Sequence, residues 1–428
     1  MQIVNLKDIC IGKGEYGIAA SAEEYSNSKY RYLRISDISD YGDLLDNDCK
    51  SVSCADCEKY LLCDDDIVFA RTGNSTGRSF FYESKYGPLV YAGFLIKFHL
   101  DNSKVNPKFM KYYTISKIYK KWVMNGPVGS TRGNLSASDY ADMPVFLPSR
   151  KTQDALVDTM ESIDEMISNN NKICSDLEGM AKLLFDYWFI QFDFPDENGN
   201  PYKSSGGKMV WNKELKCEIP EGWKVEILDR CIERIIDHRG CTPKKMGGNW
   251  AEKGNGVMAL SAKIVKNNKL TNLDDANWVT EKMYHEWMKD ELIDGDILMT
   301  SEAPLGEFYF IKGFTRYCLS QRLFAIRADV TKIMPPYLFL YLSRGMGYYQ
   351  IIGKQSGSTV FGIRQDELRK VKLLIPKMSI QEKFCKMVDP FYEKIRNTET
   401  ENQQLTSLRE FLLPMLMNGQ VKAGMVGI

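Results

Sequence analysis

The chain has 428 residues, of which 44% are apolar and 26% charged, with 56 basic and 56 acidic side chains. This length is too great for one ordinary core and predicts two domains of about 150 residues each, while the zero net charge argues against a general nucleic-acid binder. No apolar run approaches the roughly 18 residues of a membrane span. The 11 scattered cysteines do not suggest a disulfide framework and no signal peptide is evident, so we expect a cytoplasmic protein.

Short strands with turn residues between them dominate the first part of the chain. The clearest strand is predicted over Asp66–Arg71, before the glycines Gly73 and Gly77. Arginine can form two hydrogen bonds with guanine, and asparagine can do the same with adenine. The polar loop after this strand is therefore a candidate for base recognition, although a plain surface turn fits it nearly as well. Its candidate DNA-binding residues are Arg71, Thr72, Asn74 and Arg78.

A helix rich in tyrosine and lysine is predicted next, over Pro107–Met124, and a glycine-rich loop follows it. No acidic residue lies between Asp101 and Asp139. Lysines, small hydroxyls and backbone amides suit contacts with DNA phosphates. The alternative is a solvated basic helix whose aromatic residues belong to its own core. The candidate DNA-binding residues here are Lys120, Lys121, Ser130, Thr131 and Arg132.

A long helix is predicted after Pro148, because apolar residues recur there with a period of 3.5 over four heptads. The residues at its a and d positions form what we call the first seam. The Pro, Gly, Asn and Ser content of the following segment, 192–207, predicts a connection and not a core element. The seam includes Ile163, Ile167, Asn170, Leu177 and Leu184.

The chain then repeats itself with an offset of 228 residues (357 minus 129). Gly129-Ser130-Thr131 matches Gly357-Ser358-Thr359, and each is followed at the same distance by an apolar run that ends in proline and then by a glutamine. Further upstream, Asp64-Asp65-Asp66 corresponds to Asp294-Gly295-Asp296. The collinear order of the matches indicates two copies of one domain. The prolines and glutamines are Pro148 and Gln153 in the first copy, and Pro376 and Gln381 in the second.

The second copy supplies its own candidates at matching places. Its aromatic helix is predicted over Pro336–Ile352, and its DNA-binding candidates are Lys354, Ser358, Thr359 and Arg364. Its long helix has a second seam with Ile395, Thr398, Asn402 and Leu405. Polar residues near the middle of both seams favour two helices that pack on each other, because a buried polar layer fixes register. The alternative is that each helix packs only on its own domain.

Several motifs suggest chemistry but have simpler explanations. Gly12–Gly17 fits GxGxxG without a following long helix, so a dinucleotide site is not expected. Asp389-Pro390-Phe391-Tyr392 resembles a motif of adenine methyltransferases but is expected in the first turn of the second long helix. The aspartates at 64–66 are expected in a turn. Cys54-x-x-Cys57, with Cys49 and Cys63 nearby, has a zinc-like spacing, yet four free cysteines are the preferred interpretation. We expect no metal and no cofactor.

The junction between the copies carries a resemblance to a known family. Leu184–Phe189, Phe192–Pro195, Asn200–Gly207 and Ile219–Trp223 resemble the central conserved region of the specificity subunits of type I restriction-modification systems. Leu412–Gly419 is similar to their C-terminal conserved region. Together with the duplication, the resemblance covers essentially the whole chain.

The resemblance implies an α+β fold: two tandem α/β target-recognition domains separated by two long antiparallel coiled-coil helices, with a pseudo-two-fold internal repeat. It implies a non-catalytic subunit that binds a split site in double-stranded DNA and two methyltransferase subunits, and through them restriction subunits, without a membrane. The alternatives are a fused nuclease or methyltransferase, or a silent allele that only binds its partners. The expected parts are recognition domain 1 (1–148), a long helix (149–191), a linker (192–219), recognition domain 2 (220–376) and a second long helix (377–428).

Overall fold

The computed structural model describes residues 2–46, 48–126, 134–238, 240–271, 273–314, 316–357 and 361–417. These form two compact units. The first consists of Met1–Asn169 together with Asn402–Ile428, and the second of Asn170–Glu401. The first unit is therefore discontinuous in sequence, and the second is a single stretch of chain.

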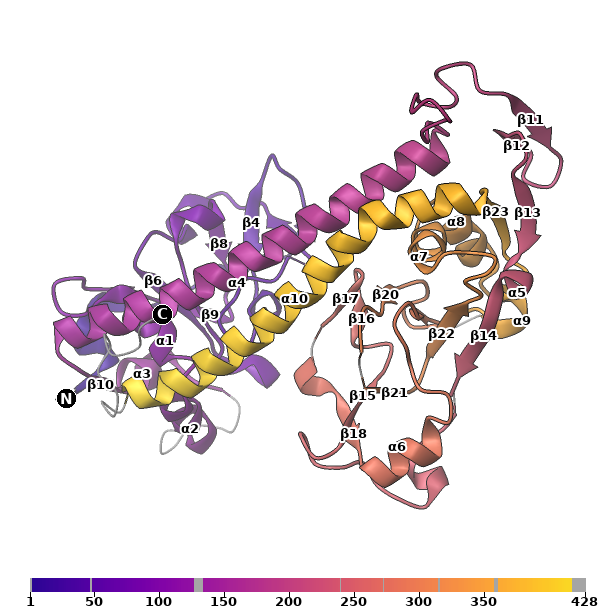
Figure 1. The fold of residues 1–428 in the computed structure, drawn as a ribbon. Helices are drawn as coiled ribbons and strands as arrows, with labels where there is room; N and C mark the ends of the chain where they lie inside the picture. The colour runs from indigo at the N-terminus through magenta and orange to yellow at the C-terminus, as the bar shows by residue number, and fades with distance from the viewer. Residues whose placement is uncertain are drawn as a thin grey trace. The chain divides into compact units, whose positions relative to one another are not determined.

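The first unit contains two four-stranded sheets (Figure 1). All five side chains of β6 (Asp66–Ala70) are buried, so this strand shows no polar alternation. The antiparallel sheet has the order β2 (Cys10–Tyr16), β9 (Leu95–Leu100), β6 and β7 (Ser79–Phe81). The other has the order β3 (Glu23–Glu24), β5 (Lys50–Val52), β4 (Tyr30–Leu33) and β8 (Leu89–Tyr91), and its β4 and β8 are parallel. A separate antiparallel pair joins β1 (Gln2–Asn5) to β10 (Pro144–Leu147).

The helix predicted over Pro107–Met124 is two helices, α1 (Pro107–Tyr113) and α2 (Lys117–Asn125), so the prediction of one continuous helix was wrong. The break has a local cause. Ser116 caps α2 by accepting a hydrogen bond from the backbone N–H of Tyr119. The other short helices of this unit are α3 (Ala137–Ala141) and the 3-10 helices Leu6–Ile9, Ile35–Asp37, Cys57–Tyr60, Gly73–Ser75 and Ser84–Tyr86.

The second unit repeats this plan. Its four-stranded antiparallel sheet has the order β14 (Ile232–Asp237), β22 (Leu323–Ala328), β19 (Ile297–Thr300) and β20 (Phe308–Phe310). Its three-stranded sheet has the order β18 (Asn277–Val279), β15 (Val257–Leu260) and β21 (Tyr317–Leu319), with β15 and β21 parallel. Its strand pairs are β13 (Lys224–Ile227) with β23 (Lys372–Ile375), β11 (Met209–Asn212) with β12 (Cys217–Pro220), and β16 (Val265–Lys266) with β17 (Lys269–Leu270).

The helix predicted over Pro336–Ile352 is likewise divided, into α7 (Pro335–Ser343) and α8 (Gly345–Gly353). The chain leaves the helical conformation at Arg344, which has extended backbone angles. The remaining short helices are α5 (Leu228–Cys231), α6 (Glu281–Trp287), α9 (Gln365–Leu368), and the 3-10 helices Pro243–Met246 and Leu273–Asp275.

The duplication extends to individual hydrogen bonds. Gln153 and Gln381 are fully buried, and each amide group bridges the same two backbone positions of its copy. The two side-chain oxygens accept from the N–H groups of Asn106 (2.8 Å) and Met334 (2.9 Å), and the two side-chain nitrogens donate to the carbonyls of Pro148 (2.9 Å) and Pro376 (3.0 Å). Every pair differs by 228 in number, so the offset seen in the sequence is also the structural one.

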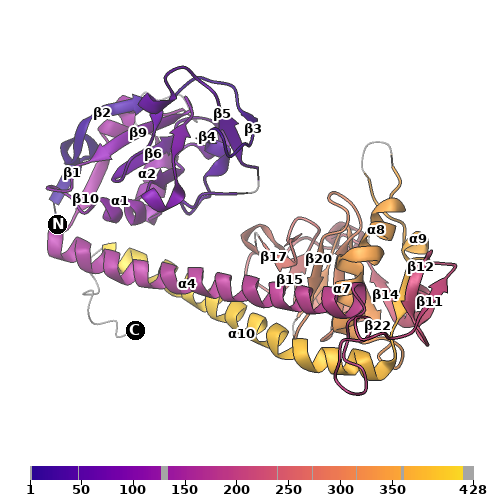
Figure 2. The same cartoon turned by 90° about the horizontal axis from the view of Figure 1, so that it is seen from above.

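Two long helices, α4 (Arg150–Phe185) and α10 (Met378–Met417), contribute to both units, and α4 continues as a π-helix over Asp186–Ile190. In the first unit the early part of α4 lies beside the end of α10, where Arg409 donates to Asp164 (2.9 Å). In the second unit the later part of α4 lies beside the start of α10, and the rings of Phe185 and Phe384 are 6.2 Å apart. The helix pair is therefore antiparallel in each unit (Figure 2).

The end of α10 completes the core of the first unit. Leu405, Leu412 and Leu416 are buried in the same apolar cluster as Leu156 and Ile163 of α4. The strands and helices of residues 1–169 therefore do not close this core by themselves.

The prediction that 192–207 is only a connection was wrong. Phe192 and Phe194 are buried in the core of the second unit, and the ring of Phe194 stacks on Tyr202 (4.7 Å) and Trp223 (5.1 Å). The Pro and Gly residues turn the chain back on itself, so that the N–H of Tyr202 donates to the carbonyl of Phe194. The turn residues are those of a loop, but the aromatic residues between them have a core role.

Candidate nucleic-acid interface

The loop after β6 is held in place by its own side chains. The Arg71 guanidinium lies 5.0 Å from the centre of the Tyr16 ring, a cation–π contact. Its Nε atom is buried and has no hydrogen-bond partner among the described residues. Asn74, in contrast, is exposed within the 3-10 helix Gly73–Ser75, and Thr72 is half-buried beside Asn134. Asn74 thus has the free amide that base recognition needs, while Arg71 is positioned against an aromatic ring.

Arg78 is engaged inside the domain. Its Nε donates to Asp40 (2.7 Å) and its Nη1 to the carbonyl of Ile38 (3.1 Å). These bonds fix the far end of the loop to the segment before β5. A DNA contact from this guanidinium would require an exchange of partners or use of its remaining donors.

Helix α2 packs directly on this loop, so the structure brings Lys120 and Lys121 of the second candidate group close to the first candidate group. The buried Tyr119 donates its hydroxyl to the carbonyl of Gly77 (2.7 Å). A Cβ at Gly77 would lie 2.5 Å from Val123, so only glycine permits this approach. Lys120 and Lys121 on α2 are exposed, and the Lys120 ammonium lies 5.2 Å from the Tyr41 ring. Loop and helix therefore form one surface with cations on it.

The glycine-rich loops lie partly outside the described residues. Ser130, Thr131 and Arg132 of the first copy, and Ser358 and Thr359 of the second, belong to this part of the chain. The residues that follow each loop are described and are held alike. Leu135 N–H donates to the Arg71 carbonyl (2.8 Å), and Ile363 N–H donates to the Ser301 carbonyl (2.9 Å). The described residues just after each glycine-rich loop are thus hydrogen-bonded to the loop that follows the central strand of their own copy.

The same surface of the second copy carries different side chains. Glu302 pairs with Arg322 (3.1 Å), a residue that was not among the predicted site residues. Lys354 pairs with Glu367 (3.1 Å), whereas Arg364 is exposed at the start of α9. Phe361, which is 55% exposed, was also missed. The two copies therefore share a backbone framework but offer different chemistry at this surface.

The GxGxxG stretch and the methyltransferase-like stretch have structural roles. Gly12–Gly17 lies in and just after strand β2, where a Cβ at Gly14 would lie 2.6 Å from the Phe98 ring. Asp389-Pro390-Phe391-Tyr392 lies well inside α10 and not in its first turn, so that expectation was wrong. There Lys312 donates to Asp389 (3.1 Å), and Tyr392 is buried. Packing of the helix against the domain explains this segment.

Cysteine pairing differs from the prediction of four free thiols. Cys54 and Cys57 form a disulfide, while Cys49 and Cys63 are free. Two residues separate Cys54 from Cys57, a spacing that pairs of zinc ligands also have. The disulfide removes both from any metal site at this place.

The seam residues lie between α4 and α10 or between the helices and the cores. Ile163, Ile395 and Leu405 are buried, and Ile167, Leu177 and Leu184 are partly buried. Thr398 is also buried, and its hydroxyl has no hydrogen-bond partner among the described residues. Asn170 and Asn402 are half-buried.

A duplicated strand framework, a loop-and-helix surface on each copy and an antiparallel pair of long helices define a tandem-repeat protein with two recognition domains. The family model for the type I restriction modification DNA specificity domain matches residues 1–178 and 222–407. The chain therefore belongs to this family, whose members are the non-catalytic specificity subunits of type I restriction-modification systems.

Known relatives agree with this assignment. The chain is 23% identical over 320 residues to the type I restriction enzyme MjaIX specificity subunit of Methanocaldococcus jannaschii, covering 74% of this chain and 69% of the relative. It is 22% identical over 399 residues to the HindI specificity subunit of Haemophilus influenzae, covering 83% and 86%. The crystal structure of the type I S subunit from M. genitalium shares the fold, with a TM-score of 0.53, 14% identity, and coverage of 97% and 95%. Among the described residues, no helix is long and apolar enough to cross a membrane.

Proposed function

We propose that this specificity subunit binds a split site in double-stranded DNA, one half with each domain, and holds two adenine methyltransferase subunits. Restriction subunits would join the complex through the methyltransferases. The complex would act in the cytoplasm. The observation that carries it is the duplicated framework with unlike loops.

The unlike loops support recognition of two different half-sites. Where the first copy has Arg71 and Thr72, the second has Ser301 and Glu302. An arginine favours guanine and phosphate, whereas a carboxylate accepts a hydrogen bond from cytosine and repels phosphate. Because the surrounding backbone bonds are the same, such exchanges change specificity without changing the domain fold.

An exposed apolar stripe supports the methyltransferase contacts. Met180, Leu183, Tyr187 and Ile190 recur every three or four residues on α4 and its π-helical end, and they are 39–70% exposed. Exposed apolar side chains at helical spacing are typical of a partner surface. The position equivalent to Leu183 (70% exposed) in the second copy is Phe411 (183 plus 228), which is 64% exposed. Equivalent positions on the two long helices would suit two copies of one partner.

The helices also offer a length scale. The 36 residues of α4 correspond to about 54 Å at 1.5 Å per residue, or about one and a half turns of B-DNA. We propose that the helix pair sets the gap between the half-sites.

The test is a map of adenine methylation in DNA from cells that produce this chain with its methyltransferase partner. We expect a motif of two short half-sites with a fixed gap, which disappears when this chain is deleted. If methylation does not depend on this chain although the methyltransferase is bound, the subunit is a silent allele that only binds partners. Methyl transfer by the purified chain alone would instead favour a fused enzyme.

A further inference from the structure

A buried carboxylate begins the central strand of each copy. Asp66 at the start of β6 and Asp296 just before β19 are 0% and 1% exposed. Each accepts a hydrogen bond from the backbone N–H three residues earlier, with Cys63 and Ile293 as the donors at 2.9 Å in both copies. The two sites are therefore the same in backbone and in the buried acid.

The copies differ in what faces the acid. In the second copy, Arg327 donates to both oxygens of Asp296, at 2.9 and 2.8 Å. In the first copy the equivalent residue (327 minus 228) is His99. A guanidinium always carries a positive charge, whereas an imidazole does so only when protonated. The first copy thus lacks the permanent counter-charge that the second copy has.

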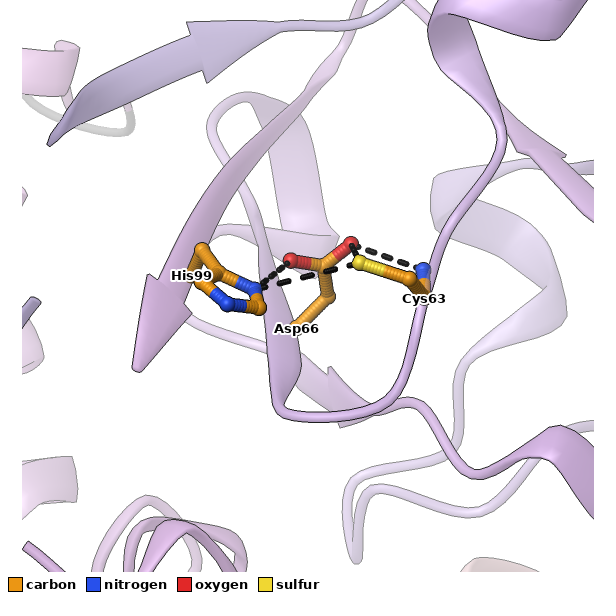
Figure 3. A group of neighbouring side chains, drawn as sticks. All are labelled: Cys63, Asp66 and His99. Carbon is orange, nitrogen blue, oxygen red and sulfur yellow. Dashed lines mark hydrogen bonds and ion pairs between the residues drawn. The ribbon is translucent and has the colours of Figure 1, made fainter. Parts of the chain in front are cut away.

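Three metal-ligating atoms surround the place of that missing charge (Figure 3). His99 Nδ1 lies 2.9 Å from Asp66 Oδ1, Cys63 Sγ lies 3.4 Å from Asp66 Oδ2, and Sγ and Nδ1 are 3.9 Å apart. Zinc binds sulfur at about 2.3 Å and nitrogen or oxygen at about 2.0–2.2 Å, which places tetrahedral ligands about 3.3–3.7 Å from one another. The Nδ1–Oδ1 and Sγ–Nδ1 distances are within a few tenths of an ångström of these separations, and one ligand atom from each of the three residues lies within 4.8 Å of the others.

The surroundings favour a cation. Asp64 and Asp65 precede Asp66 directly. Lys97 is the lysine whose positive charge acts on Cys63, and it forms an ion pair with Glu15 (3.0 Å). The Cys63 residue is exposed and the His99 side chain is 36% exposed, so an ion can enter and water can complete its coordination. The Cys63 N–H bond to Asp66 already orients the carboxylate, as outer contacts do at metal sites.

We propose that Cys63, Asp66 and His99 bind one zinc-like divalent ion, with water as the fourth ligand. The ion takes the place that the Arg327 guanidinium occupies in the second copy. It joins the segment before β6 to β9, and so stabilises the strand that leads to the loop at 71–78. Metal binding at this site does not require that the loop binds DNA, so each of the two proposals can be tested independently of the other.

The test uses the full chain in complex with its methyltransferase, stripped with a chelator and titrated with Co²⁺ and then Zn²⁺. We expect one ion per chain, and a near-ultraviolet absorption band with Co²⁺ that reports a thiolate–metal bond. Cys63→Ser should abolish this band and weaken zinc binding at least about tenfold. Cys49→Ser, which changes a free cysteine outside the cluster, should leave both unchanged.

His99→Arg separates the metal from the fold. It installs the side chain of the second copy, so we expect a folded protein with an intact Asp66 ion pair and no bound metal. Circular dichroism and metal analysis measure the two properties. Absence of the thiolate band in the unchanged chain, or full zinc content in both Cys63→Ser and His99→Arg, would overturn the proposal. If His99→Arg does not fold, Cys63→Ser decides alone.

Discussion

Gln153 and Gln381 link three segments of their copies with one side chain each. Each amide satisfies a backbone N–H just before a helix and the carbonyl of the proline that follows the last strand. A buried amide is favourable only when such bonds are made, since an unpaired buried polar group costs about 1–3 kcal/mol. The pair therefore explains why a glutamine recurs five residues after each proline.

Replacement of Gln153 by leucine should destabilise the first unit by about 2–4 kcal/mol, because two backbone groups lose their partner. Chemical denaturation followed by circular dichroism measures this. The exposed Gln404→Leu is the control and should lie within about 0.5 kcal/mol of the unchanged protein. Equal midpoints for both variants would show that the bridge contributes nothing.

At the level of elements, the helix pair of the second unit contains an unfavourable charge. Burial, and then the neighbouring Glu178 carboxylate, raise the pKa of Glu399 to about 7. Burial also raises the pKa of Glu178, although Lys269 opposes both shifts. Both glutamates lie on the long helices, and they line one small pocket together with Tyr309 and Tyr392. The packed helices thus favour the protonated form of Glu399.

The contribution of Glu399 to the free energy of unfolding should therefore fall as the pH rises from about 4.5, the ordinary pKa of glutamate, to about 7. In this window the unfolded chain releases the proton of Glu399 while the folded chain retains it. Glu399→Gln should stabilise the second unit by about 1–3 kcal/mol at pH 8 and have little effect near pH 4.5. Thermal unfolding at the two pH values measures this, with the exposed Glu393→Gln as control. A gain that is equal at both pH values would contradict the explanation.

The sequence predicts the long helices and the central strands well, because their periodicity is strong and local. It does not predict the helix breaks at Ser116 and Arg344. There a single capping side chain and a single extended residue determine where one helix ends and the next begins. The pairing of Arg78 with Asp40 depends on residues 38 positions apart. Such contacts form only when the sheets assemble, so no local sequence pattern predicts them. The same holds for Cys63 and His99, which are 36 positions apart.

At the level of the whole molecule, the exposed apolar stripe on α4 predicts how many methyltransferase subunits bind. If Leu183 and Phe411 occupy equivalent positions in two identical contacts, Leu183→Asp or Phe411→Asp should leave one methyltransferase bound, and the double variant none. Native mass spectrometry of the purified complex counts the subunits. Asn169→Asp, which adds a charge at an exposed position of α4, should leave two bound. Full occupancy in the double variant would place the contact elsewhere.

The discontinuity of the first unit has a consequence for biosynthesis. Its core includes Leu405, Leu412 and Leu416, which leave the ribosome after the whole of the second unit has been made. The second unit is continuous in sequence and can fold while the first is still incomplete. Until α10 emerges, the first unit presents an uncovered apolar surface of the kind that chaperones bind. We therefore expect chains that stop before residue 402 to be degraded or to aggregate, even though every strand of both sheets of the first unit has already been synthesised.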